Sequence, residues 1–258
     1  RKLALFCNME KERVIPAPDV ESIYQVPLTF HEHGVDAEVC QYFGIADEVP
    51  LDLEDWRQFN HNLRHPEQSV TIGIIGKYVG LADAYKSLTE ALFHGGAAHA
   101  AKVHIKWVDS EELENQDPAD VLQGLEGILV PGGFGKRGIE GKIKAIEYAR
   151  TRKIPFLGIC LGMQLAVIET ARHVAGLKNA NSAEWDQTTN APVVGLLTEW
   201  DKDGKTNHME ENMGGTMRLG AYPCVLEKGS LAYTTYNTKE IRERHRHRYE
   251  VNMHYRSV

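Results

Sequence analysis

Gly158-Ile159-Cys160-Leu161-Gly162 is the stretch of sequence that decides the fold of this chain. The apolar residues 154–159 predict a β-strand, and the pattern of residues 163–173 predicts a helix that Gly176 ends. A glycine-x-nucleophile-x-glycine sequence between a strand and a helix is typical of a nucleophile elbow, which presents a reactive side chain at the edge of a sheet. In so tight a turn, side chains two positions before and after the nucleophile would clash, which explains both glycines. We therefore predict that Cys160 is a nucleophile and not a buried apolar cysteine.

The surroundings of Cys160 predict how it would be activated. The residue precedes the first turn of a helix, where the positive end of the helix dipole favours the thiolate. The backbone N–H of Leu161 can donate to an oxyanion at this turn. Pro131-Gly132-Gly133-Phe134-Gly135 follows the predicted strand at residues 127–130, so this loop should reach the same edge of the sheet as Cys160. We expect the N–H of Gly133 to be the second oxyanion donor, and losing such a donor costs about a hundredfold in rate.

Strands and helices alternate along the middle of the chain. In addition to the two strands named above, β-branched and apolar runs predict strands at residues 70–75 and 103–108. Apolar spacing and capping residues predict helices around residues 85–92, 118–125, 143–149 and 163–173. This alternation implies right-handed crossovers and a mainly parallel, doubly wound α/β sheet.

The two ends of the chain differ from the middle. Residues 1–55 are predicted to be the end of a preceding α/β domain, and the polar residues 56–69 a linker to a domain at residues 70–258. Beyond Gly176 we expect strands and no helix, with strands at residues 193–200, 217–219 and 244–251.

Composition excludes several classes of protein. Of the 258 residues, 42% are hydrophobic and 25% are charged, which predicts a folded chain with a sizeable core. The formal net charge of −7 excludes a general electrostatic attraction to nucleic acid or anionic membranes. The nearly uncharged residues 156–168 are too few for a membrane span, which needs about 20 residues. The four cysteines form no Cys-x-x-Cys pair and no secretory signal is evident, so we expect a cytoplasmic protein without disulfides or a metal site.

Several motifs together resemble one family. Besides the elbow and the glycine loop, the motifs that carry the resemblance are Gly76-Lys77-Tyr78, Asp83-Ala84-Tyr85-Lys86-Ser87, Asn179-Ala180-Asn181-Ser182-Ala183-Glu184, Gly214-Gly215-Thr216-Met217-Arg218-Leu219-Gly220 and Arg244-His245-Arg246-His247-Arg248-Tyr249-Glu250. The chain resembles the class I (triad) glutamine amidotransferases, and most closely those of the CTP synthases. Residues 2–8 and 19–27 also resemble the end of the CTP synthase synthetase (amidoligase) domain, so the resemblance covers nearly the whole chain.

This resemblance implies a ligase of pyrimidine biosynthesis, and Cys160 would be its glutaminase nucleophile. Cys160 would attack the side-chain amide of glutamine, form a thioester and release ammonia, which would pass to the synthetase domain for the ATP-dependent amination of UTP to CTP. The residues implied to hold glutamine are Gly133, Leu161, Gly162, Met163, Gln164, Glu184 and Arg248. Glu184 and Arg248 have the charges that the α-ammonium and α-carboxylate of glutamine require.

The resemblance also implies ligands outside the glutaminase site. Lys2 would lie near the pyrimidine nucleotide, and Asp19 and Val20 near the adenine of ATP. ATP and Mg²⁺ would serve the full synthetase, while the glutaminase domain itself would bind no cofactor. GTP would be an effector, the full-length enzyme would be a homo-oligomer, and neither nucleic acid nor membrane would be a partner.

One part of the family pattern is absent from its usual place. The family takes its histidine base and orienting carboxylate from a His-Pro-Glu motif well after the arginine-rich strand, and this sequence has none there. His65-Pro66-Glu67 has the same residues but precedes the first strand of the domain. Because the chain opens on Arg1 and departs from the family after Met253, we expect a fragment of a longer enzyme that alone releases little ammonia.

Three readings therefore stay open for the chain. It is the glutaminase portion of a CTP synthase, a catalytically incomplete module that binds glutamine or a partner, or another cysteine hydrolase of the same fold.

In an extended strand, Arg244, Arg246 and Arg248 would share one face, with His245 and His247 on the other, where either histidine could replace the base. The sequence Gly73-x-x-Gly76-Lys77 lacks the spacing of a phosphate loop and predicts only a turn at a strand end.

Overall fold

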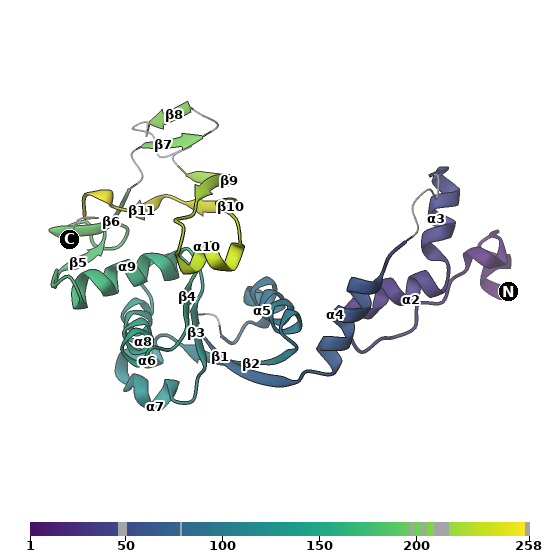
Figure 1. Ribbon diagram of the computed structural model, residues 1–258, viewed down its shortest axis with the longest axis horizontal. Helices are drawn as coiled ribbons and strands as arrows, with labels where there is room; N and C mark the ends of the chain where they lie inside the picture. The colour runs from purple at the N-terminus through teal and green to yellow at the C-terminus, as the bar shows by residue number, and fades with distance from the viewer. Residues whose placement is uncertain (46–50, 78, 197–198, 203–204, 209–216, 256–258) are drawn as a thin grey trace. The chain divides into compact units, whose positions relative to one another are not determined.

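The computed structural model of the chain describes residues 1–45, 51–77, 79–196, 199–202, 205–208 and 217–255 (Figure 1). It divides into two compact units. Unit 1 comprises Arg1–Val70 and Asp83–His104, and unit 2 comprises Thr71–Ala82 and Ile105–Val258. The division at residue 70 lies one residue beyond the predicted linker, but unit 1 also includes Asp83–His104, which lies within the domain predicted at residues 70–258.

Unit 1 is mainly helical. Its helices are α1 (Lys2–Phe6), α2 (Val26–Glu32), α3 (Val35–Phe43), α4 (Glu54–Arg64) and α5 (Lys86–Ala98), with short 3₁₀ turns η1 (Lys11–Arg13), η2 (Ile23–Gln25) and η3 (Ala82–Tyr85), the last at its boundary with unit 2. Gly34 and Gly44 have left-handed backbone conformations on either side of α3, which glycine adopts without steric cost. Most of the predicted linker at residues 56–69 belongs to helix α4.

Tyr24 connects three elements of unit 1. Its hydroxyl donates to Glu90 Oε2 at 2.5 Å and lies 2.6 Å from His94 Nε2, and both partners are on α5. Its carbonyl oxygen accepts a hydrogen bond from Trp56 Nε1 of α4 at 2.6 Å, and its ring meets that of Phe59 edge-on at 5.0 Å. The hydrogen bond to Glu90 and burial raise the pKa of Tyr24 to about 12, so the hydroxyl stays protonated and keeps donating.

A mainly parallel sheet lies at the centre of the domain predicted at residues 70–258. Its strands are β1 (Gln68–Gly76), β2 (Ala101–Asp109), β3 (Gly127–Val130) and β4 (Phe156–Gly158), in the order β2-β1-β3-β4. Strand β3 pairs in parallel with both β1 and β4, so the carboxyl ends of these three strands meet at one edge. The predicted α/β class with a mainly parallel sheet is confirmed.

Helices of unit 2 cover this sheet and bury its core. They are α6 (Glu112–Asn115), α7 (Pro118–Leu122), α8 (Ile139–Arg152) and α9 (Leu161–His173). Helices α8 and α9 pack against each other and against β3 and β4 (Figure 1). Ile128, Val130, Ile143, Leu165 and Ile168 are among the fully buried side chains between them. Strand β4 is at the end of the strand order, which explains why Leu157 remains exposed.

Three smaller sheets follow helix α9. They comprise β5 (Ala180–Ser182) with β6 (Ala191–Leu196) and β11 (Tyr249–Val251), β9 (Arg218–Val225) with β10 (Glu240–His247), and β7 (Glu199–Lys202) with β8 (Lys205–His208). A 3₁₀ turn, η4 (Met253–Tyr255), follows β11.

The prediction that no helix follows Gly176 is wrong. Helix α10 (Leu231–Tyr236) lies between β9 and β10, and Ser230 caps it by accepting a hydrogen bond from Tyr233 N at 3.1 Å. The predicted strand at residues 193–200 is described as β6 up to Leu196, and residues 197–198 lie outside the described residues.

The described residues contain no helix with the length and apolar character needed to cross a membrane. Within the same residues there is no cluster of three or more histidine, cysteine or acidic side chains arranged to hold a metal ion. All four cysteines are free thiols.

Candidate active site

Cys160 lies at a strained turn between β4 and α9. Its backbone has φ 53° and ψ −106°, in a region that residues other than glycine rarely adopt, and α9 begins at the next residue. A Cβ atom on Gly158 would lie 2.6 Å from the carbonyl carbon of Gly162, and one on Gly162 would overlap the carbonyl oxygen of Val130. The steric need for both glycines is confirmed, although the clashes are with backbone atoms of the elbow and of β3 and not with Cys160 itself.

The free Cys160 thiol is harder to ionise than its position predicts. Burial raises its pKa, the hydrogen bond from the Leu161 N–H lowers it, and the carboxylates of Glu184 and Glu250 raise it. The predicted donor at the start of α9 is therefore present, but the expectation that it favours the thiolate in the free site is wrong, because burial outweighs one N–H.

The glycine loop at residues 131–135 lies beside the elbow, as predicted. A Cβ atom on Gly132 would lie 3.4 Å from Cys160 Cβ and 4.0 Å from its Sγ, and one on Gly133 would lie 3.5 Å from a methyl group of Leu161. These are ordinary van der Waals distances, so the loop lies against Cys160 and Leu161 without a steric need for glycine at either position.

A cavity of about 300 Å³ brings together residues from five segments of unit 2. It is lined by Gly133, Phe134, Cys160, Gln164, Glu184, Met217, His247, Arg248 and Tyr249. The volume is at the lower end of the range for small-molecule sites. A thiol, a carboxylate and a guanidinium therefore line one cavity, as a glutamine site requires.

A bend in the chain places Arg248 in this cavity. Arg248 lies between β10, which pairs with β9, and β11, which pairs with β6, so the strand alternation stops at this residue. His247 and Arg248 both line the cavity, and the expectation that they lie on opposite faces is wrong. The alternation holds before the bend, where Arg244 and Arg246 are exposed and His245 is half-buried.

The remaining predicted glutamine residues have different positions. Gln164 lines the cavity, but its side-chain amide donates to the Tyr249 carbonyl oxygen at 2.8 Å and so joins α9 to β11. Leu161 is buried in the core, and Gly162 lies against Val130. Gln164 is thus the one of these three residues that lines the cavity, and Leu161 and Gly162 do not line it.

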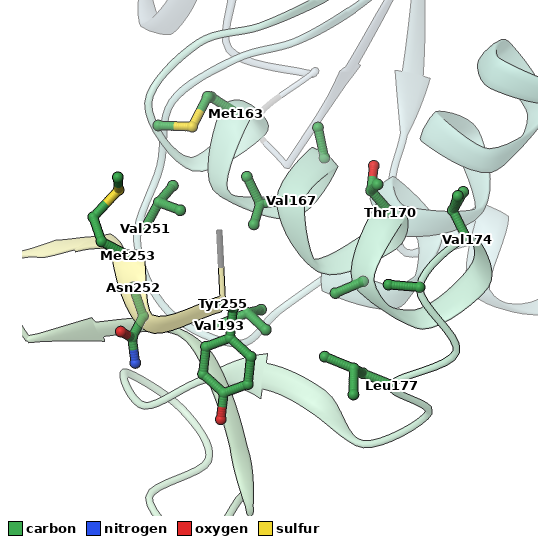
Figure 2. Close-up of a pocket in the computed structure, with 13 residues that line it drawn as sticks. Met163, Val167, Thr170, Val174, Leu177, Val193, Val251, Asn252, Met253 and Tyr255 are labelled. Atoms are coloured by element: carbon green, nitrogen blue, oxygen red, sulfur yellow. The ribbon is translucent and has the colours of Figure 1, made fainter. Parts of the chain in front are cut away.

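Met163 does not line the smaller cavity with Glu184 and Arg248, but it does line a wider cavity together with Cys160. Its side chain lines an apolar hollow of about 670 Å³ on α9, which Figure 2 shows with Val167, Val251 and Tyr255 around it. This hollow has no charged lining residue, so it lacks the groups that an amino acid would need.

Cys160 also lines a wider cavity of about 710 Å³, toward β10. His247 and Glu250 line it too, and His247 Nδ1 lies 3.5 Å from Glu250 Oε1. Burial lowers the pKa of His247, while the Glu250 carboxylate raises it and His245 and Arg218 lower it. The structure thus places a histidine and a carboxylate in one cavity with the thiol, which sequence spacing alone could not show. His65-Pro66-Glu67 lies in unit 1, whereas Cys160 belongs to unit 2.

The predicted nucleotide-binding residues belong to the other unit. Lys2, Asp19 and Val20 lie in unit 1, where Lys2 and Asp19 are exposed. The motif at residues 214–220 falls partly outside the described residues, and Met217 and Arg218 are the first residues described after that gap.

Sequence reasoning missed Lys77 and Arg218. Lys77 donates to the carbonyl oxygens of Phe134 and Gly135, and Arg218 Nη1 donates to Glu250 Oε1 at 2.6 Å. Both residues belong to motifs that carry the family resemblance, but the sequence assigned neither of them a role.

Comparisons with known proteins agree with this geometry. The family model described as glutamine amidotransferase class-I matches residues 80–257, and the model described as CTP synthase N-terminus matches residues 1–45. The CTP synthase of Zymomonas mobilis subsp. mobilis is 56% identical over 259 residues, covering 99% of this chain and 47% of that protein. The CTP synthase of Methylorubrum populi is 54% identical over 258 residues, with 99% and 47% covered.

A solved structure is also similar. The glutaminase domain of Trypanosoma brucei CTPS with bound acivicin has 41% sequence identity and a TM-score of 0.62, and the match covers 72% of this chain and 69% of that one. The chain spans about half the length of the curated relatives it matches.

Proposed function

Because this chain belongs to the CTP synthase family and carries its class I glutamine amidotransferase domain, we propose that Cys160 hydrolyses the side-chain amide of glutamine. The ammonia would serve the ATP-dependent amination of UTP to CTP in the complete enzyme. The observation that carries the proposal is the shared cavity of Cys160, Glu184 and Arg248. Glu184 would hold the α-ammonium of glutamine and Arg248 its α-carboxylate, which leaves the side-chain amide for the thiol.

The chemistry follows from the residues around the thiol. Sγ of Cys160 attacks the amide carbon, and its proton passes to a base and then to the departing nitrogen as the C–N bond breaks. The N–H groups of Leu161 and Gly133 would stabilise the oxyanion on the way to the thioester, and water then releases glutamate. The resemblance assigns the base to a His-Pro-Glu motif, while His247 with Glu250 is the second candidate because both line a cavity with Cys160.

The other ligands of the complete enzyme are proposed on the family alone. ATP, Mg²⁺ and UTP would bind the synthetase part, and GTP would act as an effector of a homo-oligomer. Of the synthetase site this chain would supply Lys2, Asp19 and Val20, one ammonium and one carboxylate among them. That is too few groups to hold a nucleotide with its metal, so these three residues would complete a site made mostly by other parts of the enzyme. We propose the cytoplasm as the compartment, which suits four free thiols.

Binding and labelling of the chain test the glutamine site. Glu184→Gln and Arg248→Ala should each weaken glutamine binding by about 1.5–3 kcal/mol in calorimetry, the usual cost of a charged hydrogen bond. Arg242→Ala is the matched control, because Arg242 is exposed on β10 and lines neither of the two cavities that Cys160 lines. Acivicin should modify Cys160 before the exposed Cys7 and Cys224, as peptide mass spectrometry would show. Unchanged glutamine affinity in both variants, or preferential labelling of Cys7 and Cys224, would overturn the proposed site.

A further inference from the structure

One peptide group of the glycine loop is held from both ends. The carbonyl oxygen of Phe134 accepts a hydrogen bond from Lys77 Nζ at 2.6 Å, and the N–H of the same peptide, on Gly135, donates to Glu184 Oε1 at 3.1 Å. Lys77 Nζ also donates to the carbonyl oxygen of Gly135 at 3.2 Å. An ammonium and a carboxylate therefore fix the orientation of the peptide between residues 134 and 135.

The order of the strands explains why Lys77 lies next to the glycine loop. Lys77 directly follows β1, which lies next to β3 in the sheet, and the glycine loop directly follows β3. Strand β2 lies on one side of β1, whereas β3 and β4 lie on the other side. The position between β1 and β3 is therefore a topological switch point, which is where open α/β sheets form their ligand sites. Arg137 Nη2 donates to the Lys77 carbonyl oxygen at 3.3 Å and so also fixes the backbone of Lys77.

Lys77 is also unusually buried for a lysine, with 9% of the residue exposed. Burial and Arg137 lower its pKa, while Glu184 and Glu111 raise it. A buried ammonium is costly unless acceptors surround it, and here two of those acceptors are loop carbonyl groups. The free-energy cost of burying the Lys77 ammonium is therefore offset when the loop has the conformation that presents these two carbonyl oxygens to it.

We propose that Lys77 is a positioning residue for the oxyanion donor of this glutaminase, and this rests on the proposed function above. Three of the five loop residues are glycine, so the loop has wide backbone freedom and an unsupported peptide group could flip. The two hydrogen bonds from Lys77 hold the peptide groups on either side of Gly135 and so limit the backbone freedom of the loop from which Gly133 would donate to the oxyanion. Glu184 would hold both the loop and the substrate ammonium, so substrate binding and loop orientation share one carboxylate.

The test separates oxyanion binding from glutamine binding. Glutamate γ-semialdehyde should add to Cys160: a C–S bond forms, the thiol proton moves to the aldehyde oxygen, and that oxygen occupies the oxyanion site. In Lys77→Met we expect its affinity to fall about tenfold or more while glutamine affinity changes less than about threefold, since only the aldehyde adduct uses the oxyanion donors. Lys77→Arg should keep most of the aldehyde affinity. Lys136→Met, an exposed lysine just after the loop, should match the wild type.

A ligand-free measurement makes the outcome decisive. The amide of Gly135 should lose its protection from hydrogen exchange in Lys77→Met while amides of α9 keep theirs, and Lys77→Gln is the second variant if the methionine variant does not fold. Unchanged protection of Gly135, or an equal loss of affinity for both ligands, would overturn the role of Lys77. A wild-type chain that binds neither ligand would instead overturn the proposed function.

Discussion

At the scale of single residues, Cys160 shows how the free site differs from the site with substrate. Burial and the carboxylates of Glu184 and Glu250 all raise the pKa of the thiol. A bound glutamine would bring its α-ammonium to Glu184 and offset one of these negative charges. Substrate binding would therefore favour the thiolate, and the empty site would keep an unreactive thiol.

The charge of Glu184 gives the first prediction at this scale. In Glu184→Gln the pKa of Cys160 should be lower than in the wild type, because one carboxylate that raises it is gone. The pH dependence of alkylation by iodoacetamide, followed at Cys160 by mass spectrometry, measures this pKa. Glu114→Gln changes an exposed carboxylate on α6 and should leave the pKa unchanged. An identical pKa in wild type and Glu184→Gln would refute the electrostatic explanation.

Residue-level prediction from sequence succeeded where a pattern has a local geometric cause. The glycines at 158 and 162 were predictable because the elbow is a local turn, and the structure shows the clashes that exclude side chains there. Arg248 was placed on the wrong face because the change of strand partner at that residue depends on β9 and β6, which are distant in sequence. The contact of Lys77 with Phe134 was not predictable because it joins residues 57 positions apart.

At the scale of elements, helices α8 and α9 are joined by an ion pair between a buried glutamate and a partly exposed arginine. The Glu169 side chain is 1% exposed, and Arg150 binds it in a bidentate manner with distances of 2.8–3.0 Å. His173 Nδ1 lies 3.1 Å from the same carboxylate. Since α9 begins directly after Cys160, this pair helps to fix the helix that positions the nucleophile.

We predict that Arg150→Met destabilises the chain by about 1–2 kcal/mol, because the buried Glu169 carboxylate would keep only His173 beside it, while solvent already screens the 39% exposed Arg150. Arg152→Met on the same helix is the control: Arg152 is exposed, its guanidinium lies 5.8 Å from the Tyr148 ring centroid, and its loss should cost about 0.5 kcal/mol. Urea unfolding followed by circular dichroism gives both values. Equal effects of the two substitutions would show that Glu169 does not depend on its arginine.

Element prediction from sequence was reliable only where the pattern repeats. The strand–helix alternation between residues 70 and 173 was predicted because apolar spacing and glycine or proline boundaries mark each element. Helix α10 was missed because it has six residues, too few for a helical period to appear. Strand β9 was predicted too short because Gly220 and Pro223 interrupt its apolar pattern.

At the scale of the whole molecule, the two compact units do not coincide with the family matches. The glutamine amidotransferase model matches residues 80–257, yet residues 83–104 cluster with residues 1–70 in unit 1. Helix α5 therefore belongs to the amidotransferase by sequence and to the helical unit by its contacts. Tyr24 provides the contacts, through Glu90 and His94 on α5.

The last prediction concerns a chain cut at the predicted domain boundary. A fragment of residues 70–258 would lack the Tyr24 and Phe59 rings that contact α5 in unit 1, and the hydroxyl that binds Glu90 and His94. We expect the amides of α5 to lose much of their hydrogen-exchange protection in this fragment, while those of α8 and α9 change little because their shared core lies within unit 2. Tyr24→Phe in the full chain keeps the ring and removes only the hydroxyl contacts, so its effect on α5 should be intermediate. If α5 is equally protected in the fragment and the full chain, the helix is held by the amidotransferase alone, and the boundary at residue 70 separates two independent structures.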